Sequence, residues 1–303
     1  MQSILYYTKN PNLLLKKVMK KYGRWIPDSI YLRIMFYLYM GKRLNLHNPK
    51  TYSEKLQWLK LYNRNPEYTL MVDKYAVKDY VVKIVGEQYV IPTLGVWDNP
   101  EDIDWDTLPD QFVLKTTHGG GNKGVIICKD KLTFDKEDAF QRLHQSLRQD
   151  IYRNFREWPY KNVRRRIIAE KYMEDSEHPS SGLADYKFFC FDGEPKAMYI
   201  ATDRNDPMEE TKFDFFDMTF HHLPFTNGHP NSSKDIPVPT MFEEMKMFAT
   251  KLSQGLPHVR IDMYVINNRI YFGEMTFFHW SGLKPFIPEK WDELFGSYLK
   301  LPL

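Results

Sequence analysis

A glycine-rich segment between two apolar β runs restricts the fold of this chain more than any other feature. Residues 112–115 and 125–128 each have the pattern of a strand, and residues 116–124 between them contain four glycines. This spacing predicts an antiparallel pair with a flexible loop at its tip. Glycine backbone can close over a phosphate, and Lys115 and Lys123 are placed to neutralise its oxygens. Such a loop also serves as a plain hairpin turn, and the Walker pattern is missing because no Gly-Lys-Ser/Thr opens a helix.

The composition sets broad limits on size, compartment and partners. The 303 residues are 43% hydrophobic and 16% aromatic, which suits two or three packed lobes with a substantial core. A net charge of +3 does not indicate a nucleic-acid partner. Cys128 and Cys190 lack the spacing of a zinc site, and the N-terminus lacks a secretory h-region. We therefore expect reduced thiols and a cytoplasmic protein.

Residues 1–70 read as a helical N-terminal region with a basic cluster. Leu13-Leu14-Leu15 leads into Lys16, Lys17, Lys20, Lys21 and Arg24. A basic cluster beside apolar residues can mark a helix that contacts the inner face of a membrane. The alternative is a solvated face on a helix that packs against the body of the protein.

The rest of the chain predicts an α+β fold with mainly antiparallel strands. Tight turns are expected at Asp192-Gly193 and Asn267-Asn268, each between two strand-like runs. A further helix is expected to be capped by either Thr51 or Ser53. The other predicted elements are helices over 73–85, 136–148 and 241–256 and strands over 89–91, 94–97 and 167–169.

Two carboxylates lie on consecutive strands of the last predicted hairpin. Strand alternation places Asp262 and Glu274 on the face opposite their apolar neighbours. Carboxylates brought together in this way repel each other unless a cation lies between them, and magnesium uses a few carboxylates plus phosphate oxygens. The pair therefore predicts a metal site, with a solvated polar face as the alternative.

Taken in chain order, these features resemble the ATP-grasp superfamily. The resemblance covers about residues 70–282. An Asp-Lys helix start is matched by Asp73-Lys74, a strand with a glycine-rich lid by 112–124, and a Glu-x-Tyr-hydrophobic hinge by Glu170 to Met173. An Asp-x-Arg-like strand start is matched by Asp185-Tyr186-Lys187, and an Arg-x-Asp strand paired with a Glu-hydrophobic-Asn-like strand by Arg260-Ile261-Asp262 and Glu274-Met275-Thr276. Thr276 replaces the usual asparagine, and Lys187 replaces an arginine, which keeps the charge but loses the bidentate geometry.

A narrower resemblance, over nearly the whole chain, is to the TupA-like branch, which is encoded among bacterial surface-polysaccharide genes. It is carried by residues 48–58, 185–193, 271–274 and 299–303. This resemblance implies an ATP-dependent ligase that joins the carboxylate of a uronic acid or related sugar precursor to an amine or amino acid through an acyl phosphate.

The resemblance also implies a division of the chain and roles for its residues. Residues 71–110 begin the ATP-grasp core, 111–168 form the lid and 169–303 form the C-terminal subdomain. ATP is expected to bind Lys74, Lys115, Gly119, Gly120, Gly121, Lys123, Glu170, Lys171, Tyr172, Met173 and Asp185. One or two magnesium ions are expected at Asp262, Glu274 and Thr276, and Arg260, Lys187 and Lys115 are expected to stabilise the transferred phosphoryl group. An anionic sugar acceptor needs cations and an aromatic face, for which Arg204, His279, Trp280 and Ser281 are the candidates.

Two other functions stay open at this point. One is an ATP-grasp kinase that phosphorylates a hydroxyl, because the fold does not fix the acceptor. The other is a glycosyltransferase, whose Asp-x-Asp signature can only be sought within residues 102–106.

Overall fold

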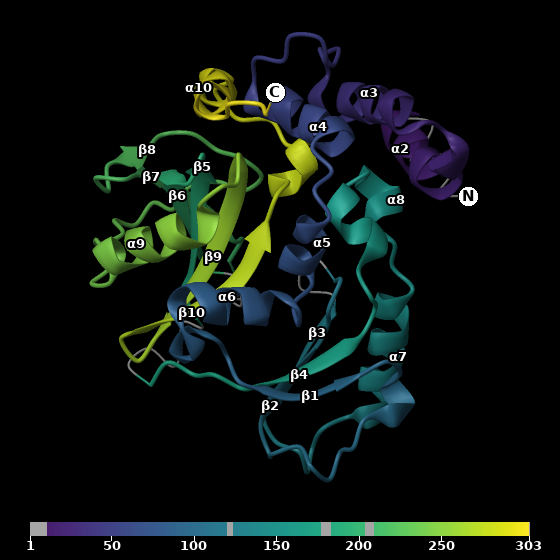
Figure 1. Ribbon diagram of the computed structural model, residues 1–303, viewed down its shortest axis with the longest axis vertical. Coiled ribbons are helices and arrows are strands. Elements are labelled where there is room, and N and C mark those ends of the chain that lie inside the picture. The colour runs from purple at the N-terminus through teal and green to yellow at the C-terminus, as the bar shows by residue number, and fades with distance from the viewer. Residues whose placement is uncertain (1–10, 120–123, 177–182, 204–208, 303) are drawn as a thin grey trace.

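The structure is a computed structural model that describes residues 11–119, 124–176, 183–203 and 209–302. A helical N-terminal part is followed by two antiparallel sheets, with helices around them (Figure 1). Every strand pairing in these ranges is antiparallel, which confirms the predicted α+β class. Among the described helices, we find none with the length and apolar character needed to span a bilayer.

The N-terminal part is helical, as predicted. A capping box begins α4, where Glu54 N donates to Thr51 Oγ1 at 3.3 Å and the Glu54 carboxylate accepts from Thr51 N at 3.2 Å. Thr51 is therefore the cap, and Ser53 lies inside the helix. The elements are α2 (Pro11–Tyr22), η1 (Gly23–Trp25), α3 (Asp28–Met40), α4 (Tyr52–Tyr62) and α5 (Glu67–Val72).

The helix predicted over 73–85 begins later than expected. The Asp73 carboxylate accepts hydrogen bonds from Tyr75 N at 2.8 Å and Ala76 N at 3.2 Å, and these bonds hold residues 73–76 in a turn. Helix α6 (Val77–Val85) follows and ends at Gly86, whose φ of 107° disfavours a side chain. The strand predicted over 89–91 is wrong, because the chain there forms the 3₁₀ turn η2 (Glu87–Tyr89).

The smaller sheet has four strands in the order β1-β4-β2-β3. Its predicted central pair is confirmed, with Phe112 opposite Cys128 and Lys115 opposite Val125. Helix α7 covers one face and buries Leu143 with Phe112 in a separate core. The elements are β1 (Thr93–Trp97), η3 (Pro100–Asp102), β2 (Phe112–Thr116), β3 (Val125–Cys128), α7 (Lys136–Leu147), α8 (Ile151–Phe155), η5 (Trp158–Asn162) and β4 (Ile167–Lys171).

The larger sheet has six strands in the order β10-β9-β5-β6-β7-β8. Both predicted hairpin turns are confirmed, with positive φ at Asp192, Gly193, Asn267 and Asn268. Helix α9 packs on one face of this sheet, and the other face carries the charged residues described below. The elements are β5 (Asp185–Phe191), β6 (Glu194–Thr202), β7 (Lys212–Asp217), β8 (His222–Leu223), α9 (Phe242–Ser253), β9 (His258–Ile266), β10 (Arg269–Thr276), η6 (His279–Gly282) and α10 (Lys290–Tyr298).

Candidate active site

The two predicted carboxylates lie side by side on the larger sheet. Asp262 of β9 pairs with Glu274 of β10, and a bulge lies between Phe272 and Glu274. A Cβ on Gly273 would meet the Asp262 carbonyl oxygen at 3.0 Å, so the bulge favours glycine. The Asp262 side chain is buried and that of Glu274 is 36% exposed. The alternative of a solvated polar face is therefore wrong for Asp262.

Two cations neutralise Asp262. The Arg260 guanidinium forms a bidentate pair with it, with Nε–Oδ1 at 2.6 Å and Nη2–Oδ2 at 2.7 Å. Lys187, directly opposite on β5, also contacts Asp262 and lies 2.7 Å from Asp185. Burial disfavours the Lys187 charge, but the two aspartates outweigh it and raise the pKa of Lys187. Lysine thus supplies a fixed positive charge here.

Glu274 stands at the rim of this network with cations on several sides. Lys74 Nζ and Arg260 Nη2 each lie 3.5 Å from its carboxylate. Burial works against the charge, but Lys74, Lys187 and Arg260 lower the pKa of Glu274 to about 2. Thr276, at the end of the same strand, accepts a hydrogen bond from Arg260 Nη2 at 3.1 Å. Glu274 is therefore ionised at neutral pH and reachable from solvent.

Lys74 joins the larger sheet to the glycine-rich lid. Its backbone N donates to Thr117 O at 2.9 Å, and its ammonium donates to Gly119 O while approaching Glu274. Gly119 itself lies tightly against β2, because a Cβ there would be 2.5 Å from Thr116 Oγ1. Gly120, Gly121 and Lys123 lie outside the described residues.

A second ion cluster lies on the smaller sheet, and only Lys115 and Glu170 of it were predicted as site residues. Glu170 of β4 is paired with Lys115 of β2 and with Lys78 of α6, each at 2.6 Å. Burial opposes ionisation, but the two lysines lower the pKa of Glu170. The missed residue, Lys78, follows Lys74 by one helical turn, and that spacing was its available signal. After Glu170, Lys171 ends β4 and points outward, and Tyr172 and Met173 continue into the next loop.

The turn after β10 is shaped by three consecutive residues with positive φ, namely Trp280 (47°), Ser281 (59°) and Gly282 (62°). Buried Lys60 fixes it by donating to Ser281 O at 2.8 Å and Ser281 Oγ at 2.9 Å. Burial lowers the pKa of Lys60 to about 7, opposed by nearby Glu157. Trp280 is 39% exposed, which leaves its ring available to a ligand.

His279 in the same turn faces the ion network. Both of its ring nitrogens have protein partners, Arg260 Nη1 at 2.7 Å and Asn227 Oδ1 at 2.8 Å. This buried position makes His279 a support for Arg260, and its predicted contact with the acceptor stays a prediction. Arg204, the remaining acceptor candidate, lies outside the described residues.

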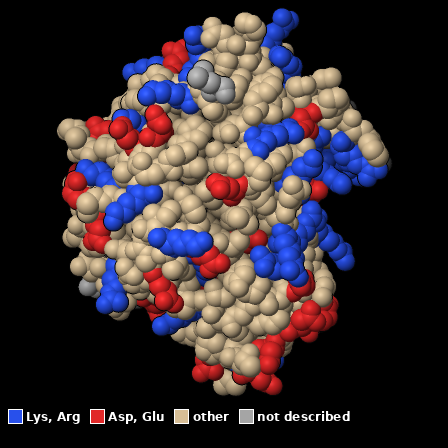
Figure 2. All heavy atoms as spheres, in the orientation of Figure 1, with Lys and Arg blue, Asp and Glu red and all other residues tan. Residues whose placement is uncertain are grey.

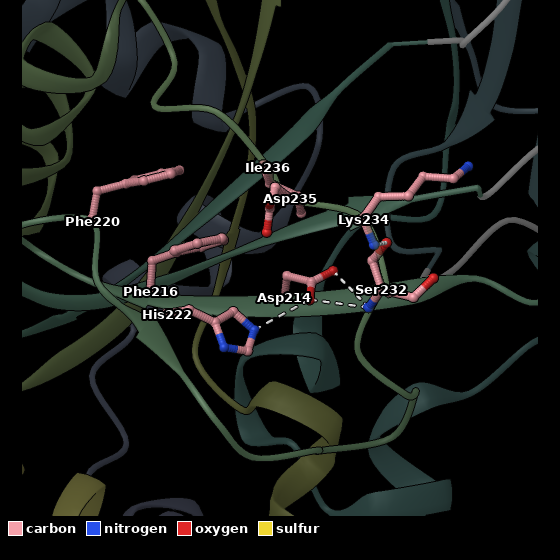
Figure 3. Close-up of a pocket in the computed structure, with 9 residues that line it drawn as sticks. Asp214, Phe216, Phe220, His222, Ser232, Lys234, Asp235 and Ile236 are labelled. Atoms are coloured by element: carbon pink, nitrogen blue, oxygen red, sulfur yellow. Dashed lines mark hydrogen bonds and ion pairs between the residues drawn. The ribbon is translucent and has the colours of Figure 1, made fainter.

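A hollow with a volume of about 440 Å³ lies elsewhere, on the opposite face of the larger sheet (Figure 3). Asp214 accepts hydrogen bonds from Ser232 N and His222 Nε2 there, beside the stacked rings of Phe216 and Phe220. Asp214 shares its cross-strand row with Met263, whose side chain points away from the Asp262 face. This hollow is therefore separate from the ion network.

The Asp-x-Asp candidate of a glycosyltransferase lies in a surface turn, in the connection between β1 and β2 of the smaller sheet. Asp102 accepts from Asn99 Nδ2 at 2.9 Å, and Asp104 accepts from Asp106 N at 3.1 Å. These carboxylates stabilise the turn. Among the described residues, no group of three or more His, Cys, Asp or Glu side chains is arranged to hold a metal.

The arrangement described above is that of the ATP-grasp class. It has two antiparallel sheets bridged by Lys74, carboxylates and cations on β5, β9 and β10, and a glycine-rich loop between β2 and β3. The model of the TupA-like ATP-grasp family matches residues 54–300, so the chain belongs to that family. The predicted family and fold are thereby confirmed. No curated protein sequence matches the chain.

Solved structures with low sequence identity to this chain are also similar to it in fold. D-alanine–D-alanine ligase from Bacillus anthracis is 17% identical with a TM-score of 0.40, over 68% of this chain and 57% of that one. The Helicobacter pylori D-alanine–D-alanine ligase is 15% identical with a TM-score of 0.43, over 82% of this chain and 69% of that one. The chain thus spans less than two thirds of the first of these ligases.

Proposed function

We propose that the protein is an ATP-dependent carboxylate–amine ligase acting in surface-polysaccharide synthesis. The observation that carries this proposal is the ion network of Arg260, Lys187, Asp262 and Glu274. Lys74 links this network to Gly119 in the glycine-rich loop. The network sets two fixed cations beside an ionised, accessible carboxylate, as transfer of a phosphoryl group requires. Membership of the TupA-like family supports the ligase class.

In the proposed reaction, a carboxylate oxygen of the sugar acceptor attacks the γ-phosphorus of ATP, and ADP leaves. The acyl phosphate is then attacked by an amine at its carbonyl carbon, which forms the amide and releases phosphate and a proton. Arg260 and Lys187 stabilise the charge on the transferred phosphoryl group. Lys74 and Lys115 hold the remaining phosphates, and residues 170–173 line the adenine site.

The donor set fits magnesium that is shared with the nucleotide. Asp262 and Glu274 are two adjacent carboxylates, and magnesium typically takes one or two carboxylates together with phosphate oxygens and water. Because Arg260 and Lys187 already engage Asp262, Glu274 is the more open ligand. Thr276 Oγ1, 3.5 Å from Glu274 Oε1, is the remaining oxygen donor. The metal would neutralise phosphate charge and orient the γ-phosphate.

The test is ADP release from the full chain with ATP and magnesium, screened against uronic acids crossed with amino acids. A ligase releases ADP in multiple turnovers only when both a carboxylate and an amine are present. ADP release with a sugar that offers only a hydroxyl, in the absence of an amine, would show that the protein is a kinase and not a ligase. Absence of ADP release across the grid, together with consumption of a sugar nucleotide, would overturn both in favour of a glycosyltransferase.

A further inference from the structure

Helix α2 turns an apolar stripe toward solvent. Leu14, Val18 and Tyr22 are spaced at i, i+4 and i+8 and so share one side of the helix. These three side chains and Leu15 are each between 40% and 63% exposed, and Trp25 in the following 3₁₀ turn is 80% exposed. A helix of a soluble protein ordinarily buries such residues. Packing among the described residues therefore does not explain this stripe.

The side of α2 that faces the protein is, by contrast, rich in lysine. Met19 is buried there, while Lys16 lies 4.0 Å above the Tyr39 ring and Lys20 lies 4.3 Å above the Phe155 ring. Burial lowers the pKa of both lysines. Cation–π contacts and lysine stems thus attach the helix to α3 and α8, which leaves its more apolar side outward.

Positive charge borders the exposed stripe along one side. Lys17 and Lys21 flank it, Arg24 follows, and Figure 2 shows Lys and Arg side chains gathered over this corner of the molecule. Residues 11–25 contain five lysine or arginine residues and no aspartate or glutamate. Figure 1 places α2 at an outer corner, beside α3. A protruding helix with apolar side chains beside a row of cations is complementary to a surface that is anionic outside and apolar below.

We propose that α2 and η1 dock in the interface of an anionic phospholipid bilayer. The stripe of Leu14, Val18, Tyr22 and Trp25 enters the boundary between headgroups and acyl chains, where exposed aromatic residues are favoured. Lys17, Lys21 and Arg24 bind the headgroup phosphates. Met19 shares a core cluster with Leu283, which follows the Trp280 turn, so docking fixes the orientation of the lobe that carries Arg260. An acidic protein surface fits the charge but gains less from the protruding apolar side chains.

The experiment is co-sedimentation of the full chain with phosphatidylglycerol vesicles and, separately, with phosphatidylcholine vesicles. We expect binding to the anionic vesicles only, weakened by added salt because the lysine contacts are screened. The Lys17→Glu/Lys21→Glu variant should partition at least roughly thirtyfold less, since each cation near an anionic surface contributes about a factor of five. Leu14→Ser/Val18→Ser should also bind less at low salt, with the charge unchanged.

A matched variant, Lys83→Glu/Lys251→Glu, makes the same change in net charge on α6 and α9, away from α2. It should bind vesicles like the wild type, and circular dichroism should show all variants folded. Wild-type protein that stays in solution with phosphatidylglycerol would overturn the proposal. So would equal loss of binding in the α2 and the matched charge variants, or unchanged binding in the Leu14→Ser/Val18→Ser variant.

Discussion

Arg260 donates a hydrogen bond from Nη1 to Nδ1 of His279 at 2.7 Å. The opposite ring nitrogen faces Asn227 Oδ1 at 2.8 Å, and the Asn227 amide nitrogen is bonded to the carbonyls of Lys284 (3.0 Å) and Pro285 (3.2 Å). These bonds assign Nε2 as protonated and Nδ1 as the acceptor. Burial and then Arg260 hold the pKa of His279 well below its usual range, so a neutral imidazole orients the guanidinium.

Without Asn227, the His279 ring is free to place an N–H against Arg260, and the Arg260–His279 hydrogen bond is lost. Asn227→Ala should therefore lower kcat for ADP formation by roughly 10- to 100-fold, as expected for one hydrogen bond to a charged group. The KM for ATP should change little, because Arg260 acts on the transferred phosphoryl group. Asn231→Ala is the matched control, since Asn231 bonds the carbonyls of Phe213 and Phe225 without contacting His279. Equal kcat values for the two variants would count against this positioning role.

The two carboxylates should differ in what they contribute to stability. Glu274→Gln should abolish ADP formation and cost about 1 kcal/mol or less of unfolding free energy, because this side chain lies at the exposed rim. Asp262→Asn should abolish ADP formation and also cost about 3–5 kcal/mol, since it leaves Arg260 and Lys187 buried without their shared partner. ADP assays and urea denaturation measure both effects. Near-normal turnover of Glu274→Gln would remove the magnesium assignment.

Glu170 should make stability depend on pH. Its pKa in the folded protein lies below the ordinary value of 4.5, so its contribution is complete above that pH and is lost as the pH falls through the folded value. Glu170→Gln should cost about 3 kcal/mol at pH 7, and the difference from wild type should shrink as the pH falls below about 4.5. Denaturation at several pH values measures this. Glu293→Gln, on the exposed side of α10, is the matched control for the loss of one carboxylate. A pH-independent difference between Glu170→Gln and wild type would contradict the ionised pair.

Trp280 should matter for the acceptor and not for ATP. Its ring is partly exposed and packs against Gly228, where a Cβ would come within 2.7 Å of Trp280 Nε1. Trp280→Ala should raise the KM for a sugar acceptor about tenfold, equivalent to about 1.4 kcal/mol, and leave the KM for ATP unchanged. Met247→Ala, an exposed residue on α9, serves as control. A rise in the KM for ATP would place the acceptor elsewhere.

Features that depend on local chemistry could be predicted from the order of residues along the chain. Alternation along β9 placed Asp262 on the face opposite Ile261 and Met263, because the side-chain period of a strand is two. The register of the Asn267-Asn268 turn alone would set Asp262 opposite Gly273, and the bulge at Gly273, which was not predicted, brings Glu274 opposite Asp262. The pairing of 112–115 with 125–128 followed from two apolar runs around a glycine-rich loop. Each of these signals lies within about twenty residues of chain.

Contacts between charges that are distant in the sequence depend on the assembled fold. Lys187 reaches Asp262 across 75 positions and His279 reaches Asn227 across 52, and a side chain's type says nothing about a partner so far away. The apolar outward face of α2 also could not be predicted locally, because Lys16 and Lys20 pack inward on Tyr39 and Phe155. Burial and partner geometry, which set the pKa of Glu274 and the tautomer of His279, exist only once the two sheets are assembled.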